Sequence, residues 1–417
     1  MKDTIYLTAR QAAQSLGISA ATLYAYVSRG LIRSEATGVT RRRRYRAEDV
    51  AALKQRRVRG REAVAAAAAR TLNFGEPILE SAITLIEGGR CYYRGMDSCA
   101  LAEQATLEDV ARLIWQPETD PFAPDNLPPA LALDAAAKSR LAKLSPAARC
   151  LTVLPLAAAA DVKALTMEAP AVARAGARLL RLVAATAGDV PFAARPAHET
   201  LARAWRLRDP ASQSLLRAAL VLSADHELNV SAFTVRCIAS AGATIYGATI
   251  GGLAALQGRR HGGITERVAA MVEELADSSD LAGAVAKRLE RGDFMLGFGH
   301  TLYRDGDPRA AWLMQRAAEV CDGPEMRFAR RLVDQIREIA GLRPNVDFAL
   351  VAISRALKLP QGAPLALFMT GRTVGWIGHA LEQYAANRLI RPRARYIGVL
   401  PHDGATFAPQ KAAKKPS

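Results

Sequence analysis

The chain has 417 residues, half of them hydrophobic, which is enough to bury a sizeable core in one large domain and a smaller one. Its formal charge is +16, and residues 1–61 hold fourteen Lys/Arg against four Asp/Glu. This concentration of charge favours a polyanionic partner for the amino-terminal segment. Five cysteines without a CxxC pair indicate reduced thiols in a cytoplasm, and no secretory leader is recognisable, so a secreted protein is not expected.

The amino-terminal segment predicts a compact helical unit. Thr8 is a candidate N-cap for a helix over residues 9–16. A second helix is expected over residues 20–29, with Leu23 and Val27 on its inner face.

A basic wing follows, in the stretch Gly38-Val-Thr-Arg-Arg-Arg-Arg-Tyr45, and a third helix is expected from Ala47. Together with Ala12-Ala-Gln-Ser-Leu-Gly-Ile-Ser19, these motifs resemble the winged helix-turn-helix of MerR and excisionase-type DNA-binding proteins. The resemblance implies that the second helix enters the major groove and that the wing neutralises phosphates. A helical dock for another protein, or a solvated run of charge, is the alternative. The DNA-binding residues implied are Thr22, Tyr24, Arg41, Arg42, Arg43 and Arg44.

The middle of the chain gives fewer signals. Two β-type runs on either side of Gly88-Gly89 predict a hairpin. Asp209-Pro210 predicts the start of a helix that continues through Leu222. Residues 230–256 are almost uninterrupted in hydrophobic and small side chains, but Arg236 lies among them. A pair of buried helices meeting through glycines is therefore favoured over a membrane span.

The stretch from Gly297 to Arg309 combines flexible backbone with polar chemistry. Gly297 and Gly299 permit unusual backbone angles, let a ligand approach the main chain and present His300. Asp307-Pro308 predicts a helix start, with Asp as the N-cap and Pro in the first turn. An imidazole and a guanidinium held in this way could bind a small molecule that carries both a carbonyl and a carboxylate.

Five more motifs flank this stretch: Asp225-His-Glu-Leu-Asn229, Gly258-Arg-Arg-His-Gly-Gly263, Pro344-Asn-Val-Asp-Phe348, Gly371-Arg-Thr-Val-Gly-Trp376 and Ile390-Arg-Pro-Arg393. In this order and at these distances they resemble the citrate synthase family, over roughly residues 74–398. The resemblance implies a mainly α fold, with all-helical large and small domains, a short β-hairpin near the start and the winged helix-turn-helix before it.

The expected boundaries follow from both resemblances. The regions are the winged helix-turn-helix 1–58, a linker helix 59–73, the citrate synthase-like domain 74–400 with a small subdomain near 262–355, and a basic tail 401–417.

The citrate synthase resemblance implies catalytic roles for three residues. Asp347 is the base that removes a proton from the methyl group of acetyl-CoA. His261 donates to the thioester oxygen, and His300 polarises the carbonyl of oxaloacetate and protonates the new hydroxyl. This chemistry needs a positioned base and hydrogen-bond donors, and it requires no metal or cofactor.

The resemblance also implies binding residues for both substrates. His226, Arg309 and Arg372 are the expected oxaloacetate ligands. Arg391 is expected to reach in from a partner subunit, so a homodimer is expected as well. The residues expected to bind coenzyme A are Arg304, Gly297 and Gly299.

Other interpretations of these residues remain open at this point. The histidines could be turn or capping residues, and Arg372 and Arg391 could be surface charges. Asp347 could also be the N-cap of a helix over residues 348–357. A metal site built from His261, His300 and Asp347 is disfavoured because no two of them have short ligand spacing.

A few positions depart from the family's pattern. Thr265 stands where asparagine is usual, Thr301 follows His300, and Ala349 and Leu350 follow the base. Every expected catalytic group is present, but substrate preference is open, and 2-methylcitrate synthesis from propionyl-CoA is an alternative. A DNA-binding regulator that senses a metabolite is the other alternative. The intact base favours an enzyme, since a sensor would not need it.

Overall fold

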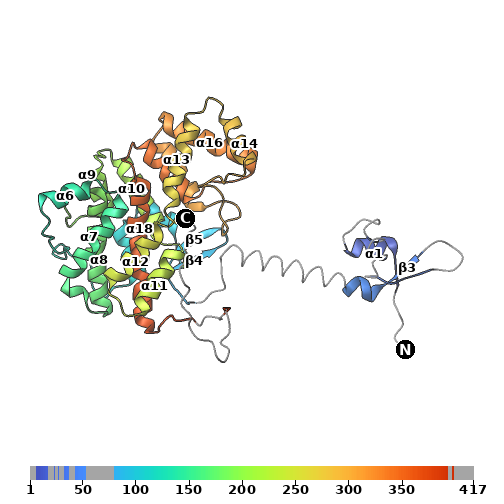
Figure 1. The fold of residues 1–417 in the computed structure, drawn as a ribbon, viewed down its shortest axis with the longest axis horizontal. Coiled ribbons are helices and arrows are strands. Elements are labelled where there is room, and N and C mark those ends of the chain that lie inside the picture. Colours follow the sequence, from blue (N-terminus) through green and yellow to red (C-terminus); the bar gives the residue numbers. More distant parts are fainter. Residues whose placement is uncertain are drawn as a thin grey trace, which may run out of the picture. The chain divides into compact units, whose positions relative to one another are not determined.

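The computed structural model describes residues 6–16, 23, 27, 32–36, 43–52, 79–392 and 397–398. The chain divides into two compact units, Met1–Glu80 and Ser81–Ser417 (Figure 1). The expected linker helix and basic tail lie outside the described residues, and the finer domain boundaries stay predictions.

The amino-terminal unit contains a small antiparallel sheet and a helix. Its described elements are β1 Tyr6–Thr8, α1 Ala9–Leu16, β2 Ser34–Ala36 and β3 Arg43–Arg46. The strand order is β1-β3-β2, and Tyr45 lies opposite both Leu7 and Ser34. Strands β2 and β3 form the two sides of the expected wing.

The helix predicted over residues 9–16 is confirmed. Thr8 Oγ1 accepts a hydrogen bond from the amide of Gln11 at 3.3 Å, as an N-cap should. Leu23 is fully buried in the core of this unit and Val27 packs against it, as expected for the inner face of the second helix. Most of that helix and the turn of the wing lie outside the described residues.

The second unit begins with the expected hairpin. Strands β4 Thr84–Glu87 and β5 Arg90–Tyr93 pair antiparallel, with β6 Met96–Asp97 beside β5. Gly88 and Gly89 form the turn with φ of 58° and 75°, a region that glycine enters without steric cost.

Helices follow for the rest of the unit. From the hairpin onward they are α4 Ser98–Gln104, α5 Leu107–Trp115, α6 Ala135–Ala142, α7 Pro146–Ala160, the 3₁₀ turn η1 Val162–Ala164, α8 Ala169–Gly188, α9 Ala197–Ala204, α10 Pro210–Leu222, α11 Val230–Ser240 and α12 Ile245–Leu256. The later ones are α13 Ile264–Ala276, α14 Leu281–Glu290, α15 Pro308–Val320, α16 Pro324–Ala340, α17 Val346–Ala356 and α18 Ala363–Ala386. Within the described residues beyond Thr106, helices are the only regular elements, which confirms the expected fold class.

Helices α11 and α12 pack against each other as the glycine-rich segment predicts. A Cβ atom on Gly251 would lie 2.0 Å from Ile238 Cδ1, so the glycine permits the close approach of the two helices. Arg236 is buried and pairs with Glu382 of α18 at 2.8 Å. None of the helices in the described part of the chain is long and hydrophobic enough to cross a membrane.

Helix α18 is the centre of the unit and packs against α5, α7, α8, α10, α11, α12 and α17 (Figure 1). Glycines on one of its faces let neighbouring backbone approach closely. A Cβ on Gly371 would lie 2.5 Å from the carbonyl oxygen of Leu220, and one on Gly375 would lie 2.5 Å from that of Ala224. The segment that links α10 to α11 therefore rests directly on α18.

We expect Gly375→Ala to destabilise the protein because the new methyl group would meet Ala224 and the Asp225 carboxylate, 2.3 Å away. Overpacking of this kind costs about 1–3 kcal/mol. Gly247→Ala is the matched control, since its nearest neighbour would be an ordinary 3.5 Å away on a helix. Denaturant unfolding of the full chain compares them, and equal midpoints would contradict the close contact.

Candidate active site

Backbone hydrogen bonds join two loops that are distant in sequence. The amide of Gly299 donates to the carbonyl of Arg343 at 2.7 Å, and the amide of Asn345 donates to the carbonyl of Gly297 at 2.9 Å. Phe298 and Phe348 add a ring contact at 4.7 Å. This pairing brings the loop that carries His300 next to the start of α17.

The glycines of this loop are needed for the fold itself. Gly297 and Gly299 have φ of 81° and 78°, which other residues rarely adopt. The Gly297 carbonyl and the Gly299 amide are both used in the pairing with residues 343–345. A Cβ on Gly297 would lie 3.0 Å from atoms of Phe348 and Val268. The close approach is therefore to the protein's own backbone and core, so the expected role in binding coenzyme A has no separate support.

Asp307 and Arg309 form a buried ion pair. The N-cap role predicted for Asp307 is confirmed, and its carboxylate accepts from Arg309 Nε at 2.9 Å and Nη2 at 2.8 Å. It also accepts from the amide of Val346 at 3.1 Å, which ties the start of α15 to the start of α17. Burial alone would raise the pKa of Asp307, but Arg309 outweighs it and lowers that pKa. Arg309 keeps one nitrogen, Nη1, without a partner among the described residues.

Arg372 enters the site from α18. Its side chain is 1% exposed, its Nε donates to the carbonyl of Ser223 at 3.0 Å, and its guanidinium lies 4.8 Å from the ring centre of Phe368. Burial lowers the pKa of Arg372, and the nearby Asp225 carboxylate acts in the opposite direction. Among the described residues the two terminal nitrogens have no hydrogen-bond acceptor. The surface-charge interpretation of Arg372 is therefore wrong.

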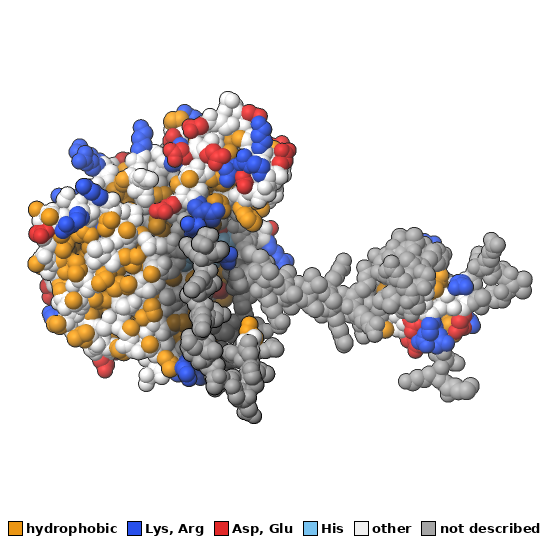
Figure 2. Space-filling model, viewed as in Figure 1, with side chains coloured by type: hydrophobic (Ala, Val, Ile, Leu, Met, Phe, Trp, Pro, Cys, Tyr) orange, Lys and Arg blue, Asp and Glu red, His pale blue; other side chains and the backbone are white. Residues whose placement is uncertain are grey.

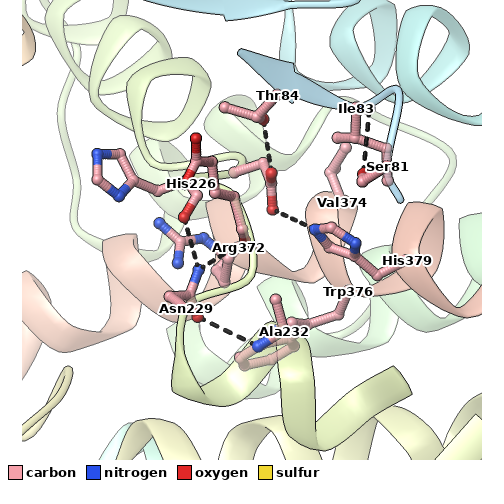
Figure 3. Close-up of polar contacts among 12 residues, drawn as sticks. Ser81, Ile83, Thr84, His226, Asn229, Ala232, Arg372, Val374, Trp376 and His379 are labelled. Carbon is pink, nitrogen blue, oxygen red and sulfur yellow. Dashed lines mark hydrogen bonds and ion pairs between the residues drawn. The ribbon is translucent and has the colours of Figure 1, made fainter. Parts of the chain in front are cut away.

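The residue before His226 anchors its loop. Asp225 is fully buried, accepts from Thr84 Oγ1 at 2.6 Å and lies 3.3 Å from His379 Nε2 (Figure 3). Burial alone would raise the pKa of Asp225, but His379 and then Arg372 reverse this and lower it. His379 has a structural role, because it lies against this carboxylate inside the fold. The short loop is fixed in this way between the hairpin and α18.

His226 and His300 lie together although they are 74 positions apart in the chain. Their ring centres are 5.2 Å apart, and His226 Nε2 is 2.9 Å from the hydroxyl of Tyr303. Burial, reinforced by Arg309, lowers the pKa of His226 well below its usual value, so the ring is neutral at pH 7. Asn229 is the N-cap of α11, so His226 is not a capping residue.

Local geometry determines the tautomer of His300. The amide of Leu302 donates to His300 Nδ1 at 3.1 Å, so Nδ1 carries the lone pair and Nε2 carries the proton. Burial, with Arg309 next, lowers the pKa of His300 to about 4. At neutral pH His300 is therefore an uncharged ring that can donate one hydrogen bond from Nε2.

His261 belongs to a chain of hydrogen bonds that starts on α18. Trp376 Nε1 donates to Ser231 Oγ at 3.1 Å, and Ser231 Oγ lies 2.8 Å from both His261 Nε2 and Asn229 Oδ1. Burial, with Arg372 next, lowers the pKa of His261 to about 4. The ring is neutral, and the single proton of Ser231 has two possible acceptors.

Asp347 lies in the first turn of α17 but does not cap it. The N-cap is Asn345, whose side chain accepts from the amide of Asp347 at 3.1 Å, so the proposed capping role of Asp347 is wrong. Asp347 Oδ1 is buried and has no hydrogen-bond partner within the described structure. Burial raises the pKa of Asp347 to about 7, although Arg309 acts in the opposite direction. An unpartnered carboxylate with this pKa is suited to accept a proton.

A cleft of about 990 Å³ opens beside this cluster, between the turn at Gly88 and helices α15 and α16. Arg304 lines it and is exposed, as a residue that binds phosphate would be. Sequence reasoning missed three other arginines that line the cleft and are exposed: Arg330, Arg337 and Arg343. Their spacing on α16 and after it gave no motif that would single them out.

Other expected residues are not brought to this cluster. Arg391 is exposed near the end of the described chain. Thr22, Tyr24, Arg41 and Arg42 lie outside the described residues. In that part of the chain that the structure describes, no three His, Cys, Asp or Glu side chains gather as metal ligands would. The five cysteines are free thiols.

Ser231 and Tyr303 were also missed by sequence reasoning. Each contacts a histidine that lies 30 or 77 positions away in the chain, so no local pattern marks it. The only available signal was position, since Ser231 follows the Asp225–Asn229 motif and Tyr303 lies between His300 and Arg309.

Comparisons with known proteins match both units of the chain. The family model for the citrate synthase C-terminal domain matches residues 73–393, and a helix-turn-helix domain model matches residues 6–58. Citrate synthase 2 of Bacillus subtilis (strain 168) is 30% identical over 347 residues, which cover 76% of this chain and 93% of that protein. A 2-methylcitrate synthase of Shewanella oneidensis is 33% identical over 191 residues, 45% of this chain and 51% of that protein.

A solved structure shares the fold. The crystal structure of citrate synthase from Thermotoga maritima MSB8 aligns with a TM-score of 0.64 and 29% identity, over 80% of this chain and 96% of that one. Since the family model spans well over half of the residues, this chain belongs to the citrate synthase family of acyl-transferring enzymes.

Proposed function

We propose that this enzyme condenses acetyl-CoA with oxaloacetate and hydrolyses the product thioester to give citrate and free coenzyme A. The observation that carries the proposal is the Asp347 carboxylate, whose buried Oδ1 has no partner among the described residues. Its pKa of about 7 makes it a base at neutral pH, and Arg309 and Arg372 are close enough to affect that pKa. The reaction needs no cofactor from the protein.

In the first step Asp347 removes a proton from the methyl group of the thioester. The developing enolate oxygen needs a donor, and neutral His261 is the candidate. The Ser231 hydroxyl can donate to His261 Nε2 instead of to Asn229. The proton of His261 then lies on Nδ1, and Nδ1 donates to the enolate oxygen. In that arrangement Ser231 sets the form of His261 that the step requires.

In the second step the enolate carbon attacks the keto carbon, and the carbonyl oxygen takes a proton. His300 is suited to polarise this carbonyl and to protonate its oxygen, because its Nε2 carries the proton. The free nitrogens of Arg372 and Nη1 of Arg309 are the candidates for the carboxylates of the keto acid. Water then attacks the thioester carbonyl, and the thiol of coenzyme A leaves.

The cleft lined by Arg304 is the candidate site for the phosphate-bearing part of coenzyme A. Arg304, Arg330 and Arg343 offer charge-assisted hydrogen bonds to phosphates, whereas the fourth arginine, Arg337, pairs with Asp334 at 2.8 Å. Leu302, Met314 and Val333 supply hydrophobic surface. The cleft lies against the loop that carries His300, so a long ligand could extend from it to Asp347.

Propionyl-CoA is the alternative acyl donor, because a relative is described as a 2-methylcitrate synthase. The extra methyl group changes little of the chemistry, so the ratio of kcat/KM values for the two thioesters decides between them. A metabolite sensor without turnover is the other alternative, and Asp347 is the residue that such a sensor would not need.

We expect Asp347→Asn to lower the rate of condensation by about two to four powers of ten, since loss of a general base has this effect. Release of free thiol from acetyl-CoA with and without oxaloacetate measures it. For the unmodified enzyme, kcat/KM for acetyl-CoA should fall as the pH drops below about 7, because protonated Asp347 cannot accept a proton. Normal turnover by the variant would remove Asp347 from the reaction.

Arg372→Leu serves as the comparison for that variant. It should raise KM for oxaloacetate about ten- to a hundredfold, because charge-assisted bonds contribute roughly 1.5–3 kcal/mol. Asp347→Asn should leave oxaloacetate binding unchanged. Equal loss of affinity for both substrates in Arg372→Leu would point to misfolding.

A homodimer is proposed as the working form, with Arg391 reaching the partner's site. Large hydrophobic side chains are exposed close together around η1: Leu156, Val162, Leu165 and Met167. Hydrophobic side chains also gather on the face of this unit over α7, α8 and α12 (Figure 2). A patch of this kind is typical of a protein interface.

We expect Leu165→Glu to convert a dimer into monomers and to lower activity, because it places a charge in the proposed interface. Sedimentation velocity with a parallel activity assay measures both effects. Ile339→Glu is the control, since Ile339 is also exposed but lies on α16. An unmodified chain that is monomeric and fully active at nanomolar concentration would contradict the role of Arg391.

DNA binding by the amino-terminal unit is proposed as a second activity, supported by the helix-turn-helix match over residues 6–58. The wing arginines are not equivalent. Both Arg43 and Arg44 are exposed, but they have different partners. Arg43 donates to the uncharged Ser34 hydroxyl at 3.1 Å, whereas Arg44 pairs with Glu35 at 3.3 Å and lies 4.2 Å from the ring centre of Tyr6. Arg43 is therefore the better candidate for a phosphate contact.

We expect replacement of residues 41–44 by alanine to flatten the salt dependence of DNA binding by roughly two to four units, at about 0.9 for each phosphate contact. Arg43→Ala alone should account for more of this change than Arg44→Ala. Fluorescence anisotropy on genomic fragments across a salt series measures it, and citrate formation should be unaffected. Equal, salt-insensitive binding by the intact chain and by a chain starting near Leu72 would rule out DNA recognition.

A further inference from the structure

Tyr303 lies among the residues assigned to the keto acid. Its side chain is 2% exposed, and its hydroxyl is 2.9 Å from His226 Nε2. Its ring centre is 4.7 Å from that of His300 and 5.8 Å from the guanidinium carbon of Arg309. One buried side chain therefore contacts three of the proposed substrate ligands.

The hydroxyl of Tyr303 restricts the state of His226. The imidazole is neutral, so one of its nitrogens carries a proton and the other carries a lone pair. Burial raises the pKa of Tyr303, so the hydroxyl keeps its proton and is able to donate it. At 2.9 Å His226 Nε2 either accepts this proton or donates its own to the hydroxyl oxygen, according to its tautomer. Donation to Nε2 leaves the His226 proton on Nδ1.

The remaining nitrogen of His226 is the one available to a ligand. Among the described residues, the side chain of His226 makes its hydrogen bond through Nε2, and none is formed by Nδ1. A carboxylate or carbonyl oxygen of the keto acid would be attracted by an N–H at this position and repelled by a lone pair. The choice of tautomer therefore decides whether His226 assists or opposes binding.

We propose that Tyr303 is a positioning residue for keto acid recognition, whose hydroxyl holds His226 in the Nδ1–H form so that it donates to the substrate. The inference rests on the proposed condensation and adds a determinant of affinity for its keto acid. It follows from the juxtaposition of the Tyr303 hydroxyl with His226 Nε2, and from the packing of the ring against His300. The rotamers of both histidines are restricted by that packing.

The test is Tyr303→Phe, which keeps the buried ring and removes only the hydroxyl. KM for oxaloacetate should rise about 5- to 100-fold, as expected for an unsatisfied buried polar group. KM for acetyl-CoA should change less than twofold. Tyr246→Phe is the matched control, because Tyr246 is also buried and loses a hydroxyl bond, 3.1 Å to Asp161, away from the site. That control should leave both KM values unchanged.

A double-mutant cycle with His226→Gln separates positioning from a general structural effect. If Tyr303 acts through His226, adding Tyr303→Phe to His226→Gln should cause little further rise in KM for oxaloacetate. Full additivity, or an equal rise in both KM values for Tyr303→Phe, would overturn the proposal.

A failure of the proposed function can be told apart from a failure of this inference. If the unmodified enzyme releases no thiol, the proposed function fails, and the same cycle is then measured as oxaloacetate affinity by calorimetry. A weaker affinity in Tyr303→Phe that disappears in the His226→Gln background would support the positioning role. No oxaloacetate binding by the unmodified enzyme would overturn both proposals.

Discussion

Burial of two positive charges is the constraint on which the site depends. Arg309 and Arg372 are 2% and 1% exposed, and a guanidinium out of water needs a negative partner. Asp307 supplies that partner for Arg309 through two hydrogen bonds, and Asp225 lies close enough to Arg372 to affect its pKa. The Asp307 carboxylate also accepts from the Val346 amide, so the pairing that balances the charge of Arg309 also fixes the start of α17 beside Asp347.

The same burial decides the chemistry of the histidines. Desolvation keeps all three site histidines neutral at pH 7, so none of them can act as a cation toward a substrate. Their usefulness depends on which nitrogen carries the proton, and that choice is made by neighbours. The Leu302 amide settles it for His300, and hydroxyl groups of Ser231 and Tyr303 are the partners of the other two. The hydrogen bonds of the site therefore determine which nitrogen of each histidine carries its proton.

Sequence reasoning succeeded where a short pattern determines local structure. The turn at Gly88-Gly89 and the helix start at Asp307-Pro308 were both predicted, because left-handed glycines and N-caps act within a few residues. It failed where several neighbours compete, since Asn345 rather than Asp347 caps α17. It could not find Tyr303, whose partner is 77 positions away. Contacts of that kind depend on the whole fold, and family resemblance supplies only those positions that a motif already contains.

The unpartnered oxygen of Asp347 has a thermodynamic consequence for the folded state. The pKa of this carboxyl is about 7 in the fold against 3.8 in an unfolded chain, so folding favours its protonated form. Below about pH 4 the group is protonated in both states and does not oppose folding. As the pH rises toward 7 the unfolded chain ionises first, and the free energy of unfolding declines by about 1.4 kcal/mol for each unit of pKa difference. This decrease in the free energy of unfolding is complete above pH 7, where Asp347 is ionised and can act as a base. The fold with ionised, reactive Asp347 is therefore less stable than the fold with the protonated group.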